Sequence, residues 1–137
     1  MIHEFQIQYT TVDNNGNDKI VKETYVTESH TCFADVETFA YETFGNLTDV
    51  DVTAIKRSRV KEIANRRTGE QDLIWEATVQ ETFVIDDVEK TMKYRLLLFA
   101  VTFDEAKSLI NYHLKQGYND MELVSLKLTK IKDVISY

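Results

Sequence analysis

The sequence predicts an α+β fold made of an internally duplicated ββαβ unit, with an antiparallel-rich sheet and two helices packed on one face of it. Apolar residues alternate every second position in long stretches and recur at helical spacing in only two short ones. The same order of elements then occurs twice. Because 137 residues suit one domain, we expect residues 1–137 to form a single domain of two pseudo-repeats, about 1–67 and 70–137.

The first repeat begins with a strand at Phe5–Tyr9, where apolar and polar residues alternate. A polar turn at Asp13–Asp18 separates it from a second strand at Lys19–Thr27, so the two form a hairpin. Apolar residues at helical spacing over Val36–Thr43 predict a helix of about three and a half turns, with Thr31 or Cys32 at its start and Gly45 just past its end. A long strand at Val50–Ile63 completes the repeat.

The second repeat follows the same plan with strands at Leu73–Ile85 and Lys90–Val101, a helix at Phe103–Gln116 and a last long strand at Met121–Val134. The hydroxyl of Thr102 and the carboxylate of Glu105 are spaced as a capping box, which satisfies backbone amides at the start of a helix. We therefore expect this helix to begin immediately after Thr102.

The two long predicted strands carry the evidence for duplication. A shift of 71 residues places Val50–Ile63 on Met121–Val134, and twelve of the fourteen residue pairs keep their chemical class. Both strands have apolar residues on both faces, whereas helices can cover only one face of a sheet. The second face must meet solvent, another chain or a ligand.

Composition and motifs argue against several classes of function. The net charge of −7 provides no global positive field to attract nucleic acid. The single cysteine, Cys32, excludes an internal disulfide, and we expect a reducing, cytoplasmic location. No apolar run approaches the length of a membrane span. Phosphate-binding loops, nucleophile elbows and metal-ligand spacings are missing, so we expect a non-enzyme without cofactor or metal.

Basic residues on the long strands predict a local binding strip. Arg57, Arg59 and Lys61 share parity and would project from one face of a strand. Cations that track phosphates, together with rings that stack on bases, are typical of single-stranded DNA-binding proteins. The candidate nucleic-acid-binding residues are Arg57, Arg59, Lys61, Lys130, Lys132, Lys93, Arg95, Tyr94, Trp75, Arg66 and Arg67. We expect single-stranded DNA as partner and a homo-oligomer.

Three other interpretations stay open. The alternating cations can be a solvated strand face, neutralised by carboxylates such as Glu23 and Glu62. The chain can be a protein–protein interaction module, with apolar, dry positions around Ile55, Leu126 and Leu128. It can also sequester a small anionic nucleotide, with Arg66 and Arg67 as phosphate clamps.

Four segments carry a family resemblance: Val21–Val26, Phe33–Glu37, Val52–Arg59 and Ile131–Tyr137. Through them the chain resembles an uncharacterised family of short proteins from Bacteroidetes bacteria and their crAss-like phages. The resemblance implies a phage or bacterial cytoplasmic protein without an established enzyme activity, in a setting near replication genes. It adds to the expectation of single-stranded DNA binding, and in this setting the protein–protein interaction module would be a phage accessory inhibitor of a host protein.

Overall fold

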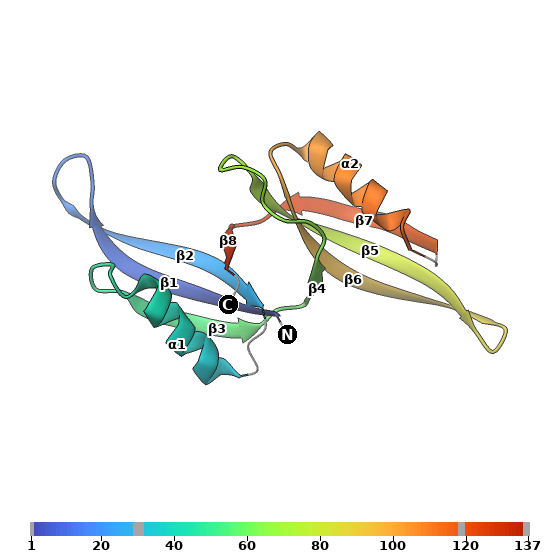
Figure 1. Cartoon of the computed structure of the whole chain (residues 1–137), viewed down its shortest axis with the longest axis horizontal. Coiled ribbons are helices and arrows are strands. Elements are labelled where there is room, and N and C mark those ends of the chain that lie inside the picture. The colour runs from blue at the N-terminus through green and yellow to red at the C-terminus, as the bar shows by residue number, and fades with distance from the viewer. Residues whose placement is uncertain (1, 29–31, 118–119, 136–137) are drawn as a thin grey trace. The chain divides into compact units, whose positions relative to one another are not determined.

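The computed structural model describes residues 2–28, 32–117 and 120–135, and within them it has eight strands and two helices (Figure 1). In chain order these are β1 (Ile2–Val12), β2 (Asp18–Glu28), α1 (Phe33–Phe44), β3 (Asp51–Arg57), β4 (Val60–Ile63), β5 (Leu73–Ile85), β6 (Val88–Ala100), α2 (Phe103–Leu114), β7 (Asp120–Leu128) and β8 (Ile131–Ile135). The predicted α+β class is confirmed. The expectation of one shared sheet is wrong, because the strands form two sheets of four.

The chain divides into two compact units, one of which is inserted into the other. Unit 1 takes in the chain up to Ser58 and again from Ile131, whereas unit 2 is the continuous segment Arg59–Lys130. The sheet of unit 1 has the order β3-β1-β2-β8, and the sheet of unit 2 has the order β4-β6-β5-β7. In each sheet the central hairpin is antiparallel, and the short outer strand β8 or β4 is parallel to its neighbour.

Each of the two long predicted strands is broken into two strands that belong to different sheets. As a result, β4 of the first repeat pairs in unit 2 and β8 of the second repeat pairs in unit 1. The chain leaves β3 at Ser58, whose amide donates to the carbonyl of Ile2, and then enters β4 in the sheet of unit 2. It leaves β7 at Thr129, whose amide and hydroxyl both donate to the carbonyl of Ile74, and returns to unit 1 as β8. The expected continuous strands Val50–Ile63 and Met121–Val134 are therefore corrected to two strands each.

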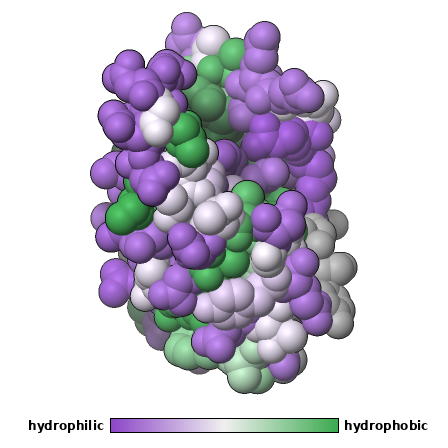
Figure 2. Space-filling view, turned by 90° about the vertical axis from the view of Figure 1, so that its left-hand side faces the viewer, coloured by the Kyte–Doolittle hydropathy of each residue, from purple (hydrophilic) through white to green (hydrophobic). Residues whose placement is uncertain are grey.

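In unit 1, α1 packs over the sheet. The buried core consists of Phe5, Ile7, Tyr25, Val36 and Ala40. The β1–β2 turn places Gly16 at φ +80°, which glycine adopts without the steric cost that a side chain would bring. Near this turn, Val12 and Ile20 remain exposed. On the face shown in Figure 2, hydrophobic groups reach the surface between hydrophilic ones.

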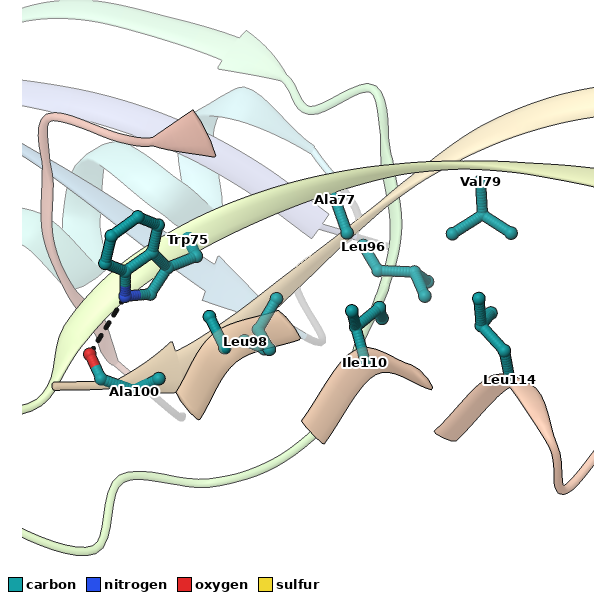
Figure 3. Close-up of a cluster of buried hydrophobic side chains, with 9 residues drawn as sticks. Trp75, Ala77, Val79, Leu96, Leu98, Ala100, Ile110 and Leu114 are labelled. Carbon is teal, nitrogen blue, oxygen red and sulfur yellow. Dashed lines mark hydrogen bonds between the residues drawn. The ribbon is translucent and has the colours of Figure 1, made fainter. Parts of the chain in front are cut away.

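In unit 2, α2 covers the sheet through Ala106, Ile110 and Leu114, which are buried (Figure 3). The strands contribute Trp75, Ala77, Val79, Leu96, Leu98 and Ala100 to the same core. The capping box is confirmed, since the Thr102 hydroxyl accepts from the amide of Glu105 at 3.2 Å. The Glu105 carboxylate accepts from the amide of Val101 at 3.1 Å, so α2 begins where the sequence predicts.

Candidate interaction surfaces

The predicted basic strip does not lie along a single strand. Arg57 ends β3 and Lys132 lies in β8, so both belong to unit 1. All the other candidate residues belong to unit 2. Parity along one strand predicted a shared face for Arg57, Arg59 and Lys61, but the break at Ser58 removes that relationship. Each unit must therefore be considered with its own cations.

Several candidate cations have partners within their own unit. Lys132 hydrogen bonds to the carboxylate of Glu23, and this contact raises the pKa of Lys132. Arg95 pairs with Glu76 at 3.3 Å. These pairs match the interpretation in which strand cations are neutralised by neighbouring carboxylates.

Arg67 is committed to the loop before β5. Its guanidinium lies 5.0 Å from the centre of the Phe99 ring and donates to the carbonyls of Gly69 and Asp72. In the same loop the Asp72 carboxylate accepts from the Thr68 amide at 2.7 Å, from the Thr68 hydroxyl and from the Gly69 amide. These hydrogen bonds, with the Thr68 amide foremost, lower the pKa of Asp72. The guanidinium of Arg67 thus has a structural role that competes with a phosphate clamp.

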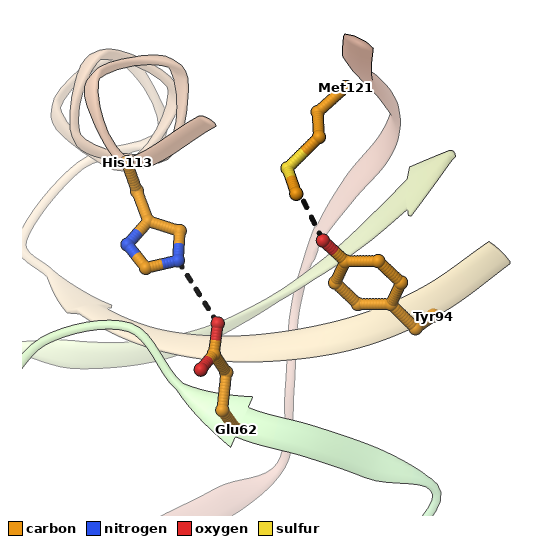
Figure 4. A network of polar contacts seen from close by, with 4 residues as sticks. All are labelled: Glu62, Tyr94, His113 and Met121. Atoms are coloured by element: carbon orange, nitrogen blue, oxygen red, sulfur yellow. Dashed lines mark hydrogen bonds and ion pairs between the residues drawn. The ribbon is translucent and has the colours of Figure 1, made fainter. Parts of the chain in front are cut away.

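The two candidate aromatic residues are covered to different extents. Trp75 is only 8% exposed, and its indole N–H donates to the carbonyl of Ala100 at 2.9 Å (Figure 3). The expectation of Trp75 as an open stacking ring is therefore wrong, because the indole is part of the core. Tyr94 is half-buried, its hydroxyl contacts the sulfur of Met121, and burial raises its pKa (Figure 4). The Lys61 ammonium lies 4.2 Å from the centre of the Tyr94 ring.

Beside Tyr94, the start of β4 remains cationic. Val60, the first residue of β4, is opposite Arg95 on the parallel strand β6, and Arg59 directly precedes it in the chain. Both Arg59 and Lys93 are exposed and, within the described residues, form no ion pair. The same holds for Arg57 and Lys130, whereas Arg66 is exposed but has a contact of its own.

The carboxylate of Glu62 in β4 meets the imidazole of His113 in α2 at 3.1 Å (Figure 4). This contact fastens the edge strand to the helix and is exposed. An open groove beside α2 and β7 has a lining of mixed charge, including Lys107, Lys115, Asp120 and Glu122. Among the described residues no cluster of three metal-ligating side chains is present.

The surface that the sequence interpretation missed is the end of the β5–β6 hairpin. These strands run on past α2 to a two-residue turn at Asp86 and Asp87 (Figure 1). We call residues 83–93 the hairpin arm. Four of its apolar side chains are exposed, namely Val84 (68%), Ile85 (47%), Val88 (54%) and Met92 (45%). The sequence held one signal for this surface, namely apolar residues at successive positions, and so on both faces, of the strands next to the turn.

The apolar positions on the long strands that a protein interface would need are buried to different extents. Ile55 and Leu126 are half-buried and pack against the cores of their units. Leu128 is 53% exposed, near the start of α2, where Phe103 is also exposed and its ring lies 6.0 Å from that of Trp75. Unit 2 therefore exposes apolar side chains at both ends of its hairpin: Leu73, Val101, Phe103 and Leu128 at one end, and the hairpin arm at the other.

Comparison with known proteins identifies the family without describing an activity. No helix in the described residues has the length and apolar character needed to cross a membrane. Neither the curated proteins nor the solved structures include a significant match to the chain. One family model, Domain of unknown function (DUF4494), matches residues 1–137. The chain therefore belongs to the DUF4494 family.

Proposed function

We propose that this chain is a non-catalytic protein–protein interaction module whose contact element is the hairpin arm. The observation that carries the proposal is the exposure of Val84, Ile85, Val88 and Met92 on an element that reaches past its covering helix. Contiguous exposed apolar side chains are costly in water and mark sites of association. A partner that covers them would remove this apolar surface from water, which is favourable for binding.

The arm is also built to present its side chains in a defined geometry. Its strands pair continuously from Leu73 opposite Ala100 to Ile85 opposite Val88. Asp86 and Asp87 both have positive φ, at 52° and 63°, as a tight hairpin turn requires. A preorganised hairpin loses little conformational entropy on binding, which favours a role in recognition.

Single-stranded DNA binding is the second candidate, and one observation favours it. The ammonium of Lys61 lies 4.2 Å from the centre of the half-buried Tyr94 ring, and two exposed cations are near these residues in the sequence: Arg59, just before β4, and Lys93, on the opposite face of β6 from Tyr94. The pairing of Arg95 and the burial of Trp75 leave this cluster smaller than the sequence predicts. The resemblance to proteins of Bacteroidetes and their crAss-like phages supports a cytoplasmic setting near replication for either candidate.

Capture of partners from a lysate tests the proposed function. We expect the full chain, immobilised in nuclease-treated lysate of a bacterium that carries a family member, to retain a specific protein identified by mass spectrometry. Ile85→Ser and Val88→Ser change exposed arm positions and should abolish this retention. Val12→Ser, at an exposed position of the other hairpin, is the matched control and should retain it. Equal retention by the arm variants and the wild type would contradict the proposal.

A titration with a fluorescent oligonucleotide at two salt concentrations distinguishes the second candidate. If the protein module is correct, no binding is expected at low salt. If the basic cluster binds DNA, Lys61→Ala should weaken binding to all sequences alike. The log–log salt slope should then fall by about 0.7 for each lost phosphate contact.

A further inference from the structure

Along the hairpin arm, one edge of strand β6 has no strand neighbour in the part of the chain that the structure describes. β5 pairs with the whole of β6, from Val88 to Ala100. On the other side, β4 pairs only with the segment Arg95–Leu97. Among the described residues, no strand pairs with that side of β6 between Val88 and Tyr94. An edge of this kind presents unpaired backbone groups to any strand of suitable sequence.

The turn determines which backbone groups face outward. In a two-residue hairpin turn, the residues that flank it, Ile85 and Val88, form a hydrogen-bonded pair. Antiparallel pairs alternate between hydrogen-bonded and non-hydrogen-bonded types. The amide and carbonyl groups of Glu89, Thr91 and Lys93 therefore point away from β5, toward the free edge.

The side chains at these three outward positions complement themselves. We propose that a second copy of this chain pairs with the edge of β6 in antiparallel register, with Thr91 opposite Thr91 of the other copy. Glu89 of each copy then lies opposite Lys93 of the other, so two favourable charge pairs form. The three opposed positions supply about six backbone hydrogen bonds. The inference rests on the proposed function and names its partner.

The same register places apolar groups together on the opposite face of the strand. Val88 of one copy lies opposite Tyr94 of the other, and Met92 lies opposite the aliphatic stem of Lys90. All four residues share the face of the sheet that α2 covers farther along, since Tyr94 packs against that core. Pairing would therefore cover two of the exposed apolar side chains of the arm.

Other symmetric registers are less favourable. Opposed residues of two paired strands must lie on the same face of the sheet. In a symmetric pair of identical antiparallel strands, the two-fold axis must therefore pass between one residue and the same residue of the other copy. With Lys90 or Glu89 at that position, like charges would face each other. With Met92 there, Glu89 would lie opposite Arg95, a position that β4 already occupies. The register centred on Thr91 avoids both problems.

Sedimentation velocity of the full chain over a range of concentrations tests the proposal. We expect a monomer–dimer equilibrium, and we expect Glu89→Lys and Lys93→Glu each to weaken the dimer about tenfold or more, because each creates two like-charge pairs. The double variant restores opposite charges and should restore the dimer. A merely structural role of either residue would not produce this rescue.

Thr91→Pro provides a test through the backbone. Its amide faces the free edge, so proline removes no hydrogen bond to β5 but blocks the centre of the proposed interface. Circular dichroism should show that this variant is folded, and sedimentation velocity should show that it is a monomer. Lys22→Glu is the matched control, because the 71-residue shift places Lys22 on Lys93, and it should leave the dimer intact.

Three outcomes would overturn the inference: a wild type that stays monomeric at all concentrations, a dimer that Thr91→Pro leaves intact, or one that dissociates with Lys22→Glu but not with Lys93→Glu. A monomeric wild type whose lysate partner is lost on Ile85→Ser would overturn the dimer and support the proposed function. If the wild type is a dimer and its arm variants retain the same lysate proteins as the wild type, the dimer is supported and the proposed function is contradicted.

Discussion

The strand exchange predicts which part of the chain can fold alone. Unit 2, the continuous segment Arg59–Lys130, contains a complete four-stranded sheet and its helix. The fragment that the sequence repeat suggests, residues 70–137, has similar length but lacks β4 and carries β8 without the sheet it pairs with. We expect the first fragment to fold cooperatively and the second to be much less stable.

The structure supplies the magnitude of this difference. The fragment 70–137 loses two hydrogen bonds between the Asn65 side chain and the backbone of Phe99, at 2.7 and 2.9 Å. It also loses the bond from the Ala64 amide to the Leu97 carbonyl at 2.8 Å. At about 1 kcal/mol each, these bonds sum to about 3 kcal/mol, and removal of half-buried Ile63 adds about 1 kcal/mol. A domain of this size has a total stability of only about 4–11 kcal/mol.

Urea unfolding followed by Trp75 fluorescence measures this difference, because the chain has one tryptophan and it lies in the core of unit 2. The fragment 70–137 also lacks Arg67, Thr68 and Gly69, which hydrogen bond to Asp72, so about 4 kcal/mol is a lower bound. With a slope of about 1 kcal/mol per molar urea, its midpoint should be at least about 4 M lower than that of Arg59–Lys130. Equal midpoints, or greater stability of 70–137, would show that β4 is not an integral strand of unit 2 and would refute the reasoning.

Three further predictions concern single side chains. Asp72 accepts hydrogen bonds that lower its pKa, so its contribution to the free energy of unfolding is present above pH ~4 and is lost as the pH falls. Asp72→Asn should therefore be less stable than the wild type at pH 7. Chemical denaturation should show that this difference in the free energy of unfolding becomes smaller toward pH 3. Trp75→Phe removes the indole donor from the Ala100 carbonyl and should lower the free energy of unfolding by about 1–3 kcal/mol, measured by circular dichroism; an unchanged value would mean that the indole hydrogen bond contributes nothing. Asp87→Gly, at φ 63°, should raise the melting temperature, since the turn favours glycine by about 0.5–1 kcal/mol; a lower melting temperature would contradict the assigned turn geometry.

Local patterns predicted the elements well where the determining forces are local. The alternation at Leu73–Ile85 matches β5 residue for residue, because one face of the strand is buried and the other is not. The capping box at Thr102 and Glu105 is present because both partners lie within one helical turn. The turn between the predicted strands, residues 86–89, is shorter in the structure, because Val88 and Glu89 already pair with β5 and only Asp86 and Asp87 have positive φ.

The candidate site was predicted less well, because its geometry depends on partners distant in the sequence. Parity placed Arg57 and Lys61 on one strand, but no local signal at Ser58 indicates that the chain changes sheets. The neutralisation of Lys132 depends on Glu23, more than a hundred residues away. The exposure of Ile85 and Val88 depends on where α2 ends relative to the hairpin.

The amino-acid sequence by itself determined the α+β class, the two hairpins and the two helices, since periodicity, capping and turn chemistry act over a few neighbouring residues. Only the tertiary structure decided that β4 and β8 are exchanged, that Trp75 is a core residue, and that the arm of unit 2 is left uncovered. The physical reason is that strand pairing and burial are satisfied by whichever surface the folded chain brings near, and a strand's own residues specify the need for a neighbour without specifying which neighbour.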